Sequence, residues 1–258
     1  MFGANPHILR IMDIETPQTS LSQSPSIPPG TRVYAVGDIH GRSDLLDQLL
    51  QTIAKDSVSA PDEVHLVFLG DYVDRGPDSK RVLERFVGLK RERPFIDFEI
   101  HILKGNHEVL METFLNGDDG DIWFNAGGLA TLVSYDVPYL PKDGPMMRES
   151  LAYALPKSHK KLLSKMENIH CVGDYAFVHA GVRPGVPIDQ QDPDDLTWIR
   201  RVFLDSEEDF GKMVVHGHTP VAVPDVLPNR IAIDTKAWCS NTLTAIVLEG
   251  ESQRFLST

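Results

Sequence analysis

Cysteine is scarce in this sequence: only Cys171 and Cys239 occur among 258 residues. Two cysteines are too few for a disulfide framework, which favours a reducing compartment, so we expect a cytoplasmic protein whose thiols are buried or inert. No run of about 18 consecutive apolar residues occurs, which argues against a transmembrane helix. The first residues also lack the basic start and apolar run of a secretory signal.

Positive charge is the second deficit. The chain has 25 Lys and Arg residues against 37 Asp and Glu residues, a net charge of −12. A chain with this charge offers no extended positively charged surface for nucleic acid or an anionic membrane, so we expect neither as a partner. An acidic protein that binds phosphate groups therefore needs cations placed locally at the site.

Short apolar runs alternate with helical patterns in the first half of the chain. Runs at 32–36, 63–69 and 98–103 are rich in Val, Ile, Leu and Phe and end at glycine-containing turns, which is typical of buried strands. Helices are expected between them, one capped by Ser43 and one after Ser79. This alternation predicts βαβ units, and hence an α/β protein. Further strands are expected at 175–179, 212–216, 230–234 and 243–249; their closer spacing predicts an antiparallel portion in a mixed sheet.

The chain divides into a tail and one domain. Residues 1–30 include a polar run with four prolines and little to bury, which predicts a flexible tail. Residues 31–258 are expected to form a single catalytic domain. Within it, residues 116–168 show mostly helical patterns and are expected to form an insertion or cap.

Five of the apolar runs are followed at once by a turn that carries metal-binding side chains. In open α/β sheets, functional groups gather just beyond the carboxyl ends of the strands, and glycines there let the backbone turn sharply. One such turn alone would be weak evidence, but five in order are a strong signal. The turns are GDIHG (37–41), GDYVDRG (70–76), GNHE (105–108), HAG (179–181) and HGHT (216–219).

The residue types in these turns specify the chemistry. Asp38 and His40 are two residues apart, so in an extended segment they point the same way and can hold one cation. The two carboxylate oxygens of Asp71 can bridge that cation and another. A ligand set without thiolates suits borderline divalent ions, and two such ions about 3.5–4 Å apart suit hydrolytic phosphoryl chemistry. Neutral ligands for the second ion are available on Asn106, His179 and His218.

In these motifs the chain resembles the phosphoprotein phosphatases among the calcineurin-like metallophosphoesterases, and most of all the compact bacterial and phage-type members. The resemblance implies an αββα sandwich of mixed sheets with flanking helices and a centre of two divalent metal ions, with Mn²⁺ expected and Fe, Zn or Ni as alternatives. It also implies the ligands. The first ion would take Asp38, His40 and Asp71, and the second would take Asp71, Asn106, His179 and His218.

The resemblance also implies roles for side chains that are not solely ligands. His107 matches the general acid that protonates the leaving group, and Asp74 would orient its ring. Arg75 and Arg200 match phosphate-binding arginines, and Asn106 would also face the substrate. His216 is a rival to His218 as a ligand. The implied mechanism is in-line attack by a metal-bridging hydroxide.

These motifs lead to a metal-dependent phosphomonoesterase acting on phosphoserine or phosphothreonine in proteins, with phosphotyrosine as a further option. The expected partner is therefore a phosphorylated protein or peptide. The alternative is hydrolysis of dinucleoside polyphosphates such as diadenosine tetraphosphate. Related enzymes with that activity vary the motif residues that stand here as His40 and Asp74, which favours the phosphatase. A metal-binding pseudoenzyme that serves as an interaction module is a third hypothesis, although the complete motif set speaks against it.

Overall fold

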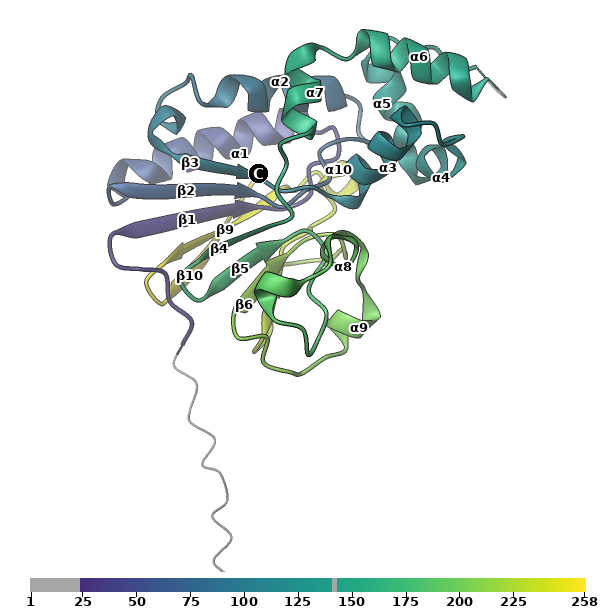
Figure 1. The fold of residues 1–258 in the computed structure, drawn as a ribbon. Helices are drawn as coiled ribbons and strands as arrows, with labels where there is room; N and C mark the ends of the chain where they lie inside the picture. The colour runs from purple at the N-terminus through teal and green to yellow at the C-terminus, as the bar shows by residue number, and fades with distance from the viewer. Residues whose placement is uncertain (1–23, 141–142) are drawn as a thin grey trace, which may run out of the picture.

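Two five-stranded sheets pack face to face between layers of helices (Figure 1). The structure is a computed structural model that describes residues 24–140 and 143–258. The strand orders are β10-β9-β1-β2-β3 in the first sheet and β4-β5-β6-β8-β7 in the second. Both sheets are mixed, because β1, β2 and β3 run parallel beside the antiparallel β9, and β5, β6 and β8 run parallel between antiparallel edges. The predicted α/β sandwich of mixed sheets is confirmed.

The strands and helices follow one another along the chain with short connections. The strands are β1 (Thr31–Val36), β2 (Glu63–Phe68), β3 (Glu99–Ile102), β4 (Ile169–Val172), β5 (Tyr175–Val178), β6 (Met213–His216), β7 (Asp225–Val226), β8 (Arg230–Ala232), β9 (Thr244–Glu249) and β10 (Ser252–Ser257). The helices are α1 (Ser43–Asp56), α2 (Ser79–Leu89), α3 (Asn106–Leu115), α4 (Asp121–Trp123), α5 (Leu129–Ser134), α6 (Gly144–Ala154), α7 (Lys157–Leu163), α8 (Pro193–Trp198), α9 (Arg201–Leu204) and α10 (Ala237–Ser240).

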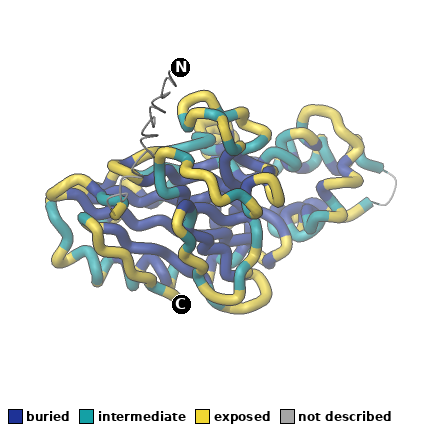
Figure 2. The backbone as a smooth tube through the Cα atoms, turned by 90° about the horizontal axis from the view of Figure 1, so that it is seen from below, coloured by how far each residue is buried: buried dark blue, intermediate teal, exposed yellow. Residues whose placement is uncertain are grey.

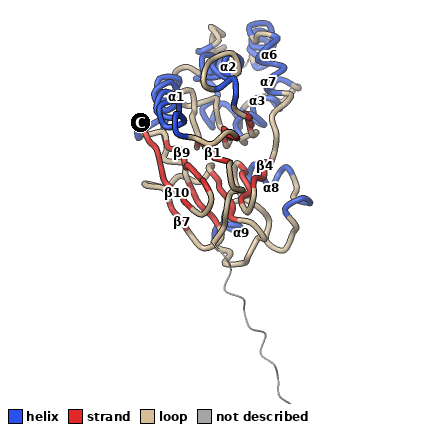
Figure 3. The backbone as a smooth tube through the Cα atoms, turned by 90° about the vertical axis from the view of Figure 1, so that its left-hand side faces the viewer, coloured by secondary structure: helices blue, strands red, loops and turns tan. Residues whose placement is uncertain are grey.

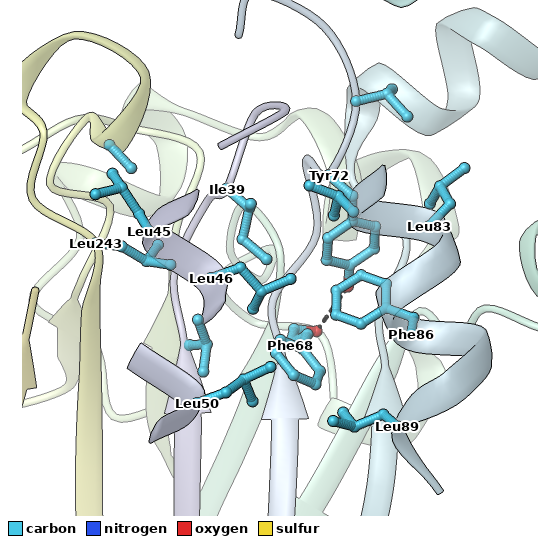
Figure 4. Close-up of a cluster of buried hydrophobic side chains, with 14 of the residues drawn as sticks. Ile39, Leu45, Leu46, Leu50, Phe68, Tyr72, Leu83, Phe86, Leu89 and Leu243 are labelled. Carbon is cyan, nitrogen blue, oxygen red and sulfur yellow. Dashed lines mark hydrogen bonds between the residues drawn. The ribbon is translucent and has the colours of Figure 1, made fainter. Parts of the chain in front are cut away.

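Alternation along the buried strands builds two separate cores. In β1, Tyr34 and Val36 face α1 and α2, whereas Val33 and Ala35 face the second sheet, because successive side chains of a strand point to opposite faces. Figure 4 shows the helix-side core, and Figure 3 shows α1 and α2 on the face of the first sheet that points away from the second. A third apolar cluster joins the other face of the second sheet to α8 and α9. The buried backbone accordingly runs through the middle of the molecule, and the exposed loops surround it (Figure 2).

The helices α4 to α7 lie between β3 and β4 in the chain, within the segment 116–168 that was expected to be mostly helical. α4 and α6 contact α3, and α5 and α7 contact α2 (Figure 1). No helix within the described ranges has the length and apolar character needed to cross a bilayer.

The sequence analysis missed three strands and placed the cap of one helix wrongly. β4 and β7 are short, and β10 is largely exposed, so none of the three has a strong apolar run. Ser43 does not cap α1: it is the first helical residue, is buried, and its hydroxyl donates to Asp78. Asp78 itself caps α2, because its carboxylate accepts the backbone N–H of Arg81. The two cysteines, expected to be buried or inert, are both exposed.

The predicted tail extends too far into the chain. Residues 1–23 lie outside the described residues, but the rest of the predicted tail, residues 24–30, belongs to the fold. Ile27 is buried in the core between the sheets, and its backbone N–H donates to the Gly250 carbonyl at 2.9 Å. The N–H of Ser26 donates to the Asp174 carboxylate at 3.0 Å. One buried apolar side chain together with these backbone hydrogen bonds therefore anchors a run that is otherwise polar and proline-rich.

Candidate metal centre

The six predicted metal ligands meet at the carboxyl ends of strands from both sheets. Asp38 and His40 follow β1, Asp71 follows β2, Asn106 begins α3 just after β3, and the two histidines follow β5 and β6. Because these strands are parallel within each sheet, their ends lie side by side. All six side chains are 6% exposed or less. The two histidines that follow β5 and β6 are His179 and His218, respectively.

Asp71 stands between two groups of histidine nitrogens. One group joins it to His40 and His107, the other to His179 and His218, and in each group the ligand atoms lie within 4.8 Å of one another. Its Oδ2 is 3.4 Å from His40 Nε2, while its Oδ1 is 3.4 Å from His179 Nε2. The two carboxylate oxygens thus face different histidines, as a carboxylate that bridges two cations must.

Backbone carbonyls orient two of the histidines. His40 donates from Nδ1 to the Val73 carbonyl at 2.9 Å, and His179 donates from Nδ1 to the Leu69 carbonyl at 3.0 Å. Because Nδ1 carries the proton, the unprotonated Nε2 of each neutral ring faces the cluster with a lone pair. Burial lowers the pKa of His40 to about 3, which keeps this ligand form at neutral pH.

Asn106 joins the histidines of the second group. Its Oδ1 is 3.0 Å from His179 Nε2 and 2.8 Å from His218 Nδ1. Burial lowers the pKa of His218 to about 2, so that this imidazole also stays neutral. His216 is directed elsewhere: it is buried, its Nδ1 donates to the Gly217 carbonyl, and its ring packs on Phe203. The geometry therefore favours His218 as the ligand.

Asp38 belongs to neither of the two groups, and it has an acidic neighbour that the sequence analysis did not assign to the site. Its carboxylate accepts the backbone N–H of His218 at 3.0 Å. Burial, Asp234 and Asp71 raise the pKa of Asp38 well above its usual range, and burial raises that of Asp234 to about 6. Asp234 ends an apolar run just as Asp38 and Asp71 do, and that position was the signal available in the sequence.

The cluster fits a pair of divalent cations. Asp38, Asp71 and Asp234 are buried close together; burial and the neighbouring carboxylates raise the pKa of Asp38 and Asp234, whereas the surrounding histidines lower the pKa of Asp71. Burial lowers the pKa of His40 and His218, so these two imidazoles are neutral and add no positive charge of their own. Burying carboxylates together is costly unless cations are bound among them. Oxygen and imidazole nitrogen ligands without thiolate suit the borderline ions that the sequence predicted.

A buried hydrogen-bond network around Asp74 holds His107, in addition to the contacts of His107 with Asp71 and His40. Its Nδ1 is 2.6 Å from Asp74 Oδ2, and the Asp74 carboxylate also accepts from Trp123 Nε1 at 2.9 Å and from Thr131 Oγ1 at 2.6 Å. Burial alone would lower the pKa of His107, but Asp71 and Asp74 outweigh it and raise the pKa. An imidazole held in this way, with its pKa raised, is placed to act as a general acid.

The two predicted arginines lie over the ligand nitrogens from the exposed side. Arg75 places Nη1 3.1 Å from His40 Nε2 and Nη2 3.0 Å from His107 Nε2. Arg200 donates from Nε to His218 Nε2 at 3.0 Å. Both guanidinium groups can therefore reach a phosphate group held at the mouth of the centre.

Backbone strain concentrates at this site. Eight non-glycine residues in the described parts of the chain have φ between 45° and 73°. Such conformations are costly for side-chain-bearing residues and persist where surrounding structure enforces them, often at functional sites. Five of the eight are predicted site residues: His40, Asp71, Asp74, Arg75 and His218.

Glu108 supports the strained turn and was missed by the sequence analysis. It is fully buried, and its carboxylate accepts four backbone N–H groups, those of Gly105, Asp71, Tyr72 and Val73, at 2.8–3.2 Å. The signal was its position three residues after Gly105 at the start of a helix, which is the spacing of a capping box. Gly105 must remain glycine, because a Cβ there would lie 2.2 Å from Asp71 Oδ1.

Replacing Glu108 is expected to destabilise the whole protein. Glu108→Ala would leave four backbone donors without their acceptor, and each unsatisfied buried group costs roughly 1–3 kcal/mol. We expect the free energy of unfolding to fall by about 3 kcal/mol or more, measured by urea denaturation. Glu112→Ala, which removes a partly exposed glutamate on the same helix, is the matched control. An equal, small effect of both changes would contradict this role for Glu108.

Comparison with known proteins identifies the family. Residues 31–242 match the calcineurin-like phosphoesterase family, so the chain belongs to it and is a metal-dependent phosphoesterase. The asymmetrical bis(5′-nucleosyl)-tetraphosphatase PrpE of Oceanobacillus iheyensis is 25% identical over 233 residues, which are 83% of this chain and 87% of the relative.

Two solved structures share the fold. A crystal structure provisionally named as a diadenosine tetraphosphatase superposes with a TM-score of 0.60 at 22% identity and covers 91% of this chain and 98% of its own. A cold-active protein tyrosine phosphatase gives a TM-score of 0.55 at 19% identity and covers 90% and 81%. At these identities the two structures support the fold and nothing finer.

Proposed function

We propose that this phosphoesterase hydrolyses dinucleoside polyphosphates, which is the alternative and not the leading expectation of the sequence analysis. The observation that carries this choice is a pair of exposed tryptophans beside the candidate metal centre. Trp198 is 40% exposed, with its ring centroid 6.4 Å from that of His218; Trp238 is 38% exposed, with the Arg75 guanidinium 5.7 Å from its ring centroid. Trp238 therefore lies next to Arg75, and Trp198 lies near His218, which also accepts the Arg200 hydrogen bond.

This arrangement suits a substrate with a base at each end of a phosphate chain. Exposed aromatic rings stack on nucleobases, and arginines contact phosphate oxygens. The PrpE relative, whose name is that of such a hydrolase, aligns over most of the length of both chains. A phosphopeptide would have no comparable need for two flat aromatic surfaces on either side of the site.

The residues of this chain have distinct tasks in the proposed reaction. Two divalent ions held by Asp38, His40, Asp71, Asn106, His179 and His218 would activate water and neutralise phosphate charge. Arg75 and Arg200 would bind the phosphate oxygens and stabilise the charge that develops as the bond to the leaving group breaks. His107, held by Asp74, would donate a proton from Nε2 to the leaving oxygen.

A second candidate function is the phosphoprotein phosphatase activity on phosphorylated serine or threonine. The observation that favours it is the presence of His40 and Asp74, the two residues on which the sequence analysis based its preference for the phosphatase. His40 lies in the cluster and Asp74 anchors His107, so both positions bear on catalysis.

Parallel assays separate the two candidates. The Mn²⁺-loaded protein would be given diadenosine tetraphosphate and a phosphoserine peptide at equal concentrations, and kcat/KM measured for each. We expect a clear preference for the dinucleotide. A preference for the peptide would overturn the proposal in favour of the second candidate.

The tryptophans give a sharper test. Trp198→Ala and Trp238→Ala are each expected to lower kcat/KM for diadenosine tetraphosphate roughly 5- to 150-fold, because stacking on an aromatic ring contributes about 1–3 kcal/mol per base. Activity on p-nitrophenyl phosphate, which has no nucleobase, should change little. Tyr153→Ala removes an aromatic side chain that is 94% exposed on α6 and is the control. Equal losses on both substrates would argue against stacking.

A further inference from the structure

Three histidines form a second cluster away from the candidate metal centre. His65 lies in β2, His101 in β3 and His170 in β4. β3 is an edge strand of the first sheet, and β4 is an edge strand of the second. A backbone β-bridge between Leu103 and Glu167 connects the two edges. The candidate metal centre lies beyond the carboxyl end of β2, whereas His65 is in its first half. The three histidines therefore lie where the edges of the two sheets meet.

The imidazole nitrogens converge closely enough to share one ion. One nitrogen from each ring lies within 4.8 Å of the other two. The rings of His101 and His170 stack with centroids 3.4 Å apart, and the His65 centroid is 5.7 Å and 5.6 Å from theirs. Burial and the two neighbouring histidines lower the pKa of His170 to about 4, so that ring is neutral and retains a lone pair for a metal.

Each ring also carries a buried nitrogen that has no hydrogen-bond partner. These atoms are His65 Nδ1, His101 Nε2 and His170 Nε2, and the His65 residue as a whole is only 6% exposed. Buried polar atoms are nearly always satisfied, and leaving one unpaired costs free energy. Three unpaired nitrogens in one cluster indicate a ligand that would satisfy them together.

Glutamates surround the outer side of the cluster in the way that supports metal-binding histidines. His65 Nε2 is 3.0 Å from Glu63 Oε1, and His101 Nδ1 is 3.2 Å from Glu167 Oε1. When a carboxylate accepts a hydrogen bond from one ring N–H, it fixes the tautomer and turns the other nitrogen toward a metal. Glu99 Oε2 is 3.6 Å from His65 Nδ1 and is available as a fourth, oxygen ligand.

We propose that His65, His101 and His170 form a mononuclear binding site for a borderline divalent ion of the zinc class. Three imidazoles with one oxygen ligand match the ligand types and number of a tetrahedral zinc site. A bound ion would link β2 and β3 of the first sheet to β4 of the second. Its role would then be to hold the sheet edges together, independently of the phosphoesterase reaction.

Metal stoichiometry tests this site whatever the chemistry of the candidate centre. Purified protein would be dialysed against Zn²⁺, freed of unbound metal, and analysed for zinc per chain. We expect His170→Gln to bind one ion fewer than the wild type. His159→Gln changes a buried histidine that bonds to Tyr135 outside the cluster, and should bind as much as the wild type. Equal zinc content in the wild type and folded His170→Gln would overturn the proposal.

A measurement on the unaltered protein covers the case in which His170→Gln does not fold. Crystals soaked in Zn²⁺ would be measured at the zinc absorption edge for anomalous scattering. We expect a peak among the three imidazoles, at about 2.0–2.1 Å from each ligating nitrogen. No peak there, with zinc visible at the candidate centre, would overturn the proposal and leave the proposed function untouched.

Discussion

His107→Asn is expected to slow turnover, most strongly for substrates whose leaving group needs a proton, while the metal content of the centre stays near normal. The substitution removes the proposed general acid but no predicted ligand, and loss of a general acid costs on the order of 100- to 10,000-fold in rate. Asp74 would remain fixed by Trp123 and Thr131, so the pocket should keep its shape. Measuring kcat together with bound metal tests both parts of this expectation.

The size of the loss should depend on the leaving group. A serine alkoxide needs a proton as it leaves, whereas a nucleotide phosphate or nitrophenolate is far less basic and needs it less. We therefore expect the smallest loss of rate on p-nitrophenyl phosphate and the largest on a phosphoserine peptide. The loss on diadenosine tetraphosphate should be close to that on p-nitrophenyl phosphate. A uniform loss accompanied by loss of metal would instead make His107 a ligand, consistent with its place beside His40 and Asp71.

Asp71→Asn is expected to abolish both metal binding at the centre and activity. The Asp71 oxygens face His40 on one side and His179 on the other, and an amide has only one oxygen and no negative charge. Because the ions supply several kcal/mol of transition-state stabilisation, the rate should fall by at least about 1,000-fold. Elemental analysis and initial rates on one preparation would measure the two effects.

Asp136→Asn is the matched control for that substitution. Asp136 also has positive φ, at 59°, but it belongs to no metal-type cluster in the described residues. Asparagine tolerates this backbone conformation well, so both metal and activity should be retained. Retention of both ions by Asp71→Asn would contradict the bridging role.

The parts of the fold that rest on strong local patterns were predictable. β1, β2 and β9 are apolar runs bounded by turns, and the structure places them within one residue of the predicted ends. The edge strand β10 has no such run, because its residues are mostly exposed and are held by pairing with β9. Pairing between distant segments leaves no local mark in a sequence.

The same contrast applies to the site. His40 and His218 follow apolar runs directly, so their convergence could be expected from the topology of an α/β sheet. The spacing of Glu108 from Gly105 marks it only as a residue at the start of a helix. Its contact with the strained turn at Tyr72, and that of Trp123 with Asp74, join distant segments and leave no local mark in the sequence. The substrate was the least predictable feature, because the metal-binding motifs are shared by enzymes that act on different phosphate esters.

Anomalous diffraction from Mn²⁺-loaded crystals would test the central claim most directly. The account predicts two manganese peaks about 3.5–4 Å apart, one on each side of the Asp71 carboxylate, with imidazole nitrogens completing both sites. A single peak, or a pair of peaks that does not involve Asp71, would contradict it.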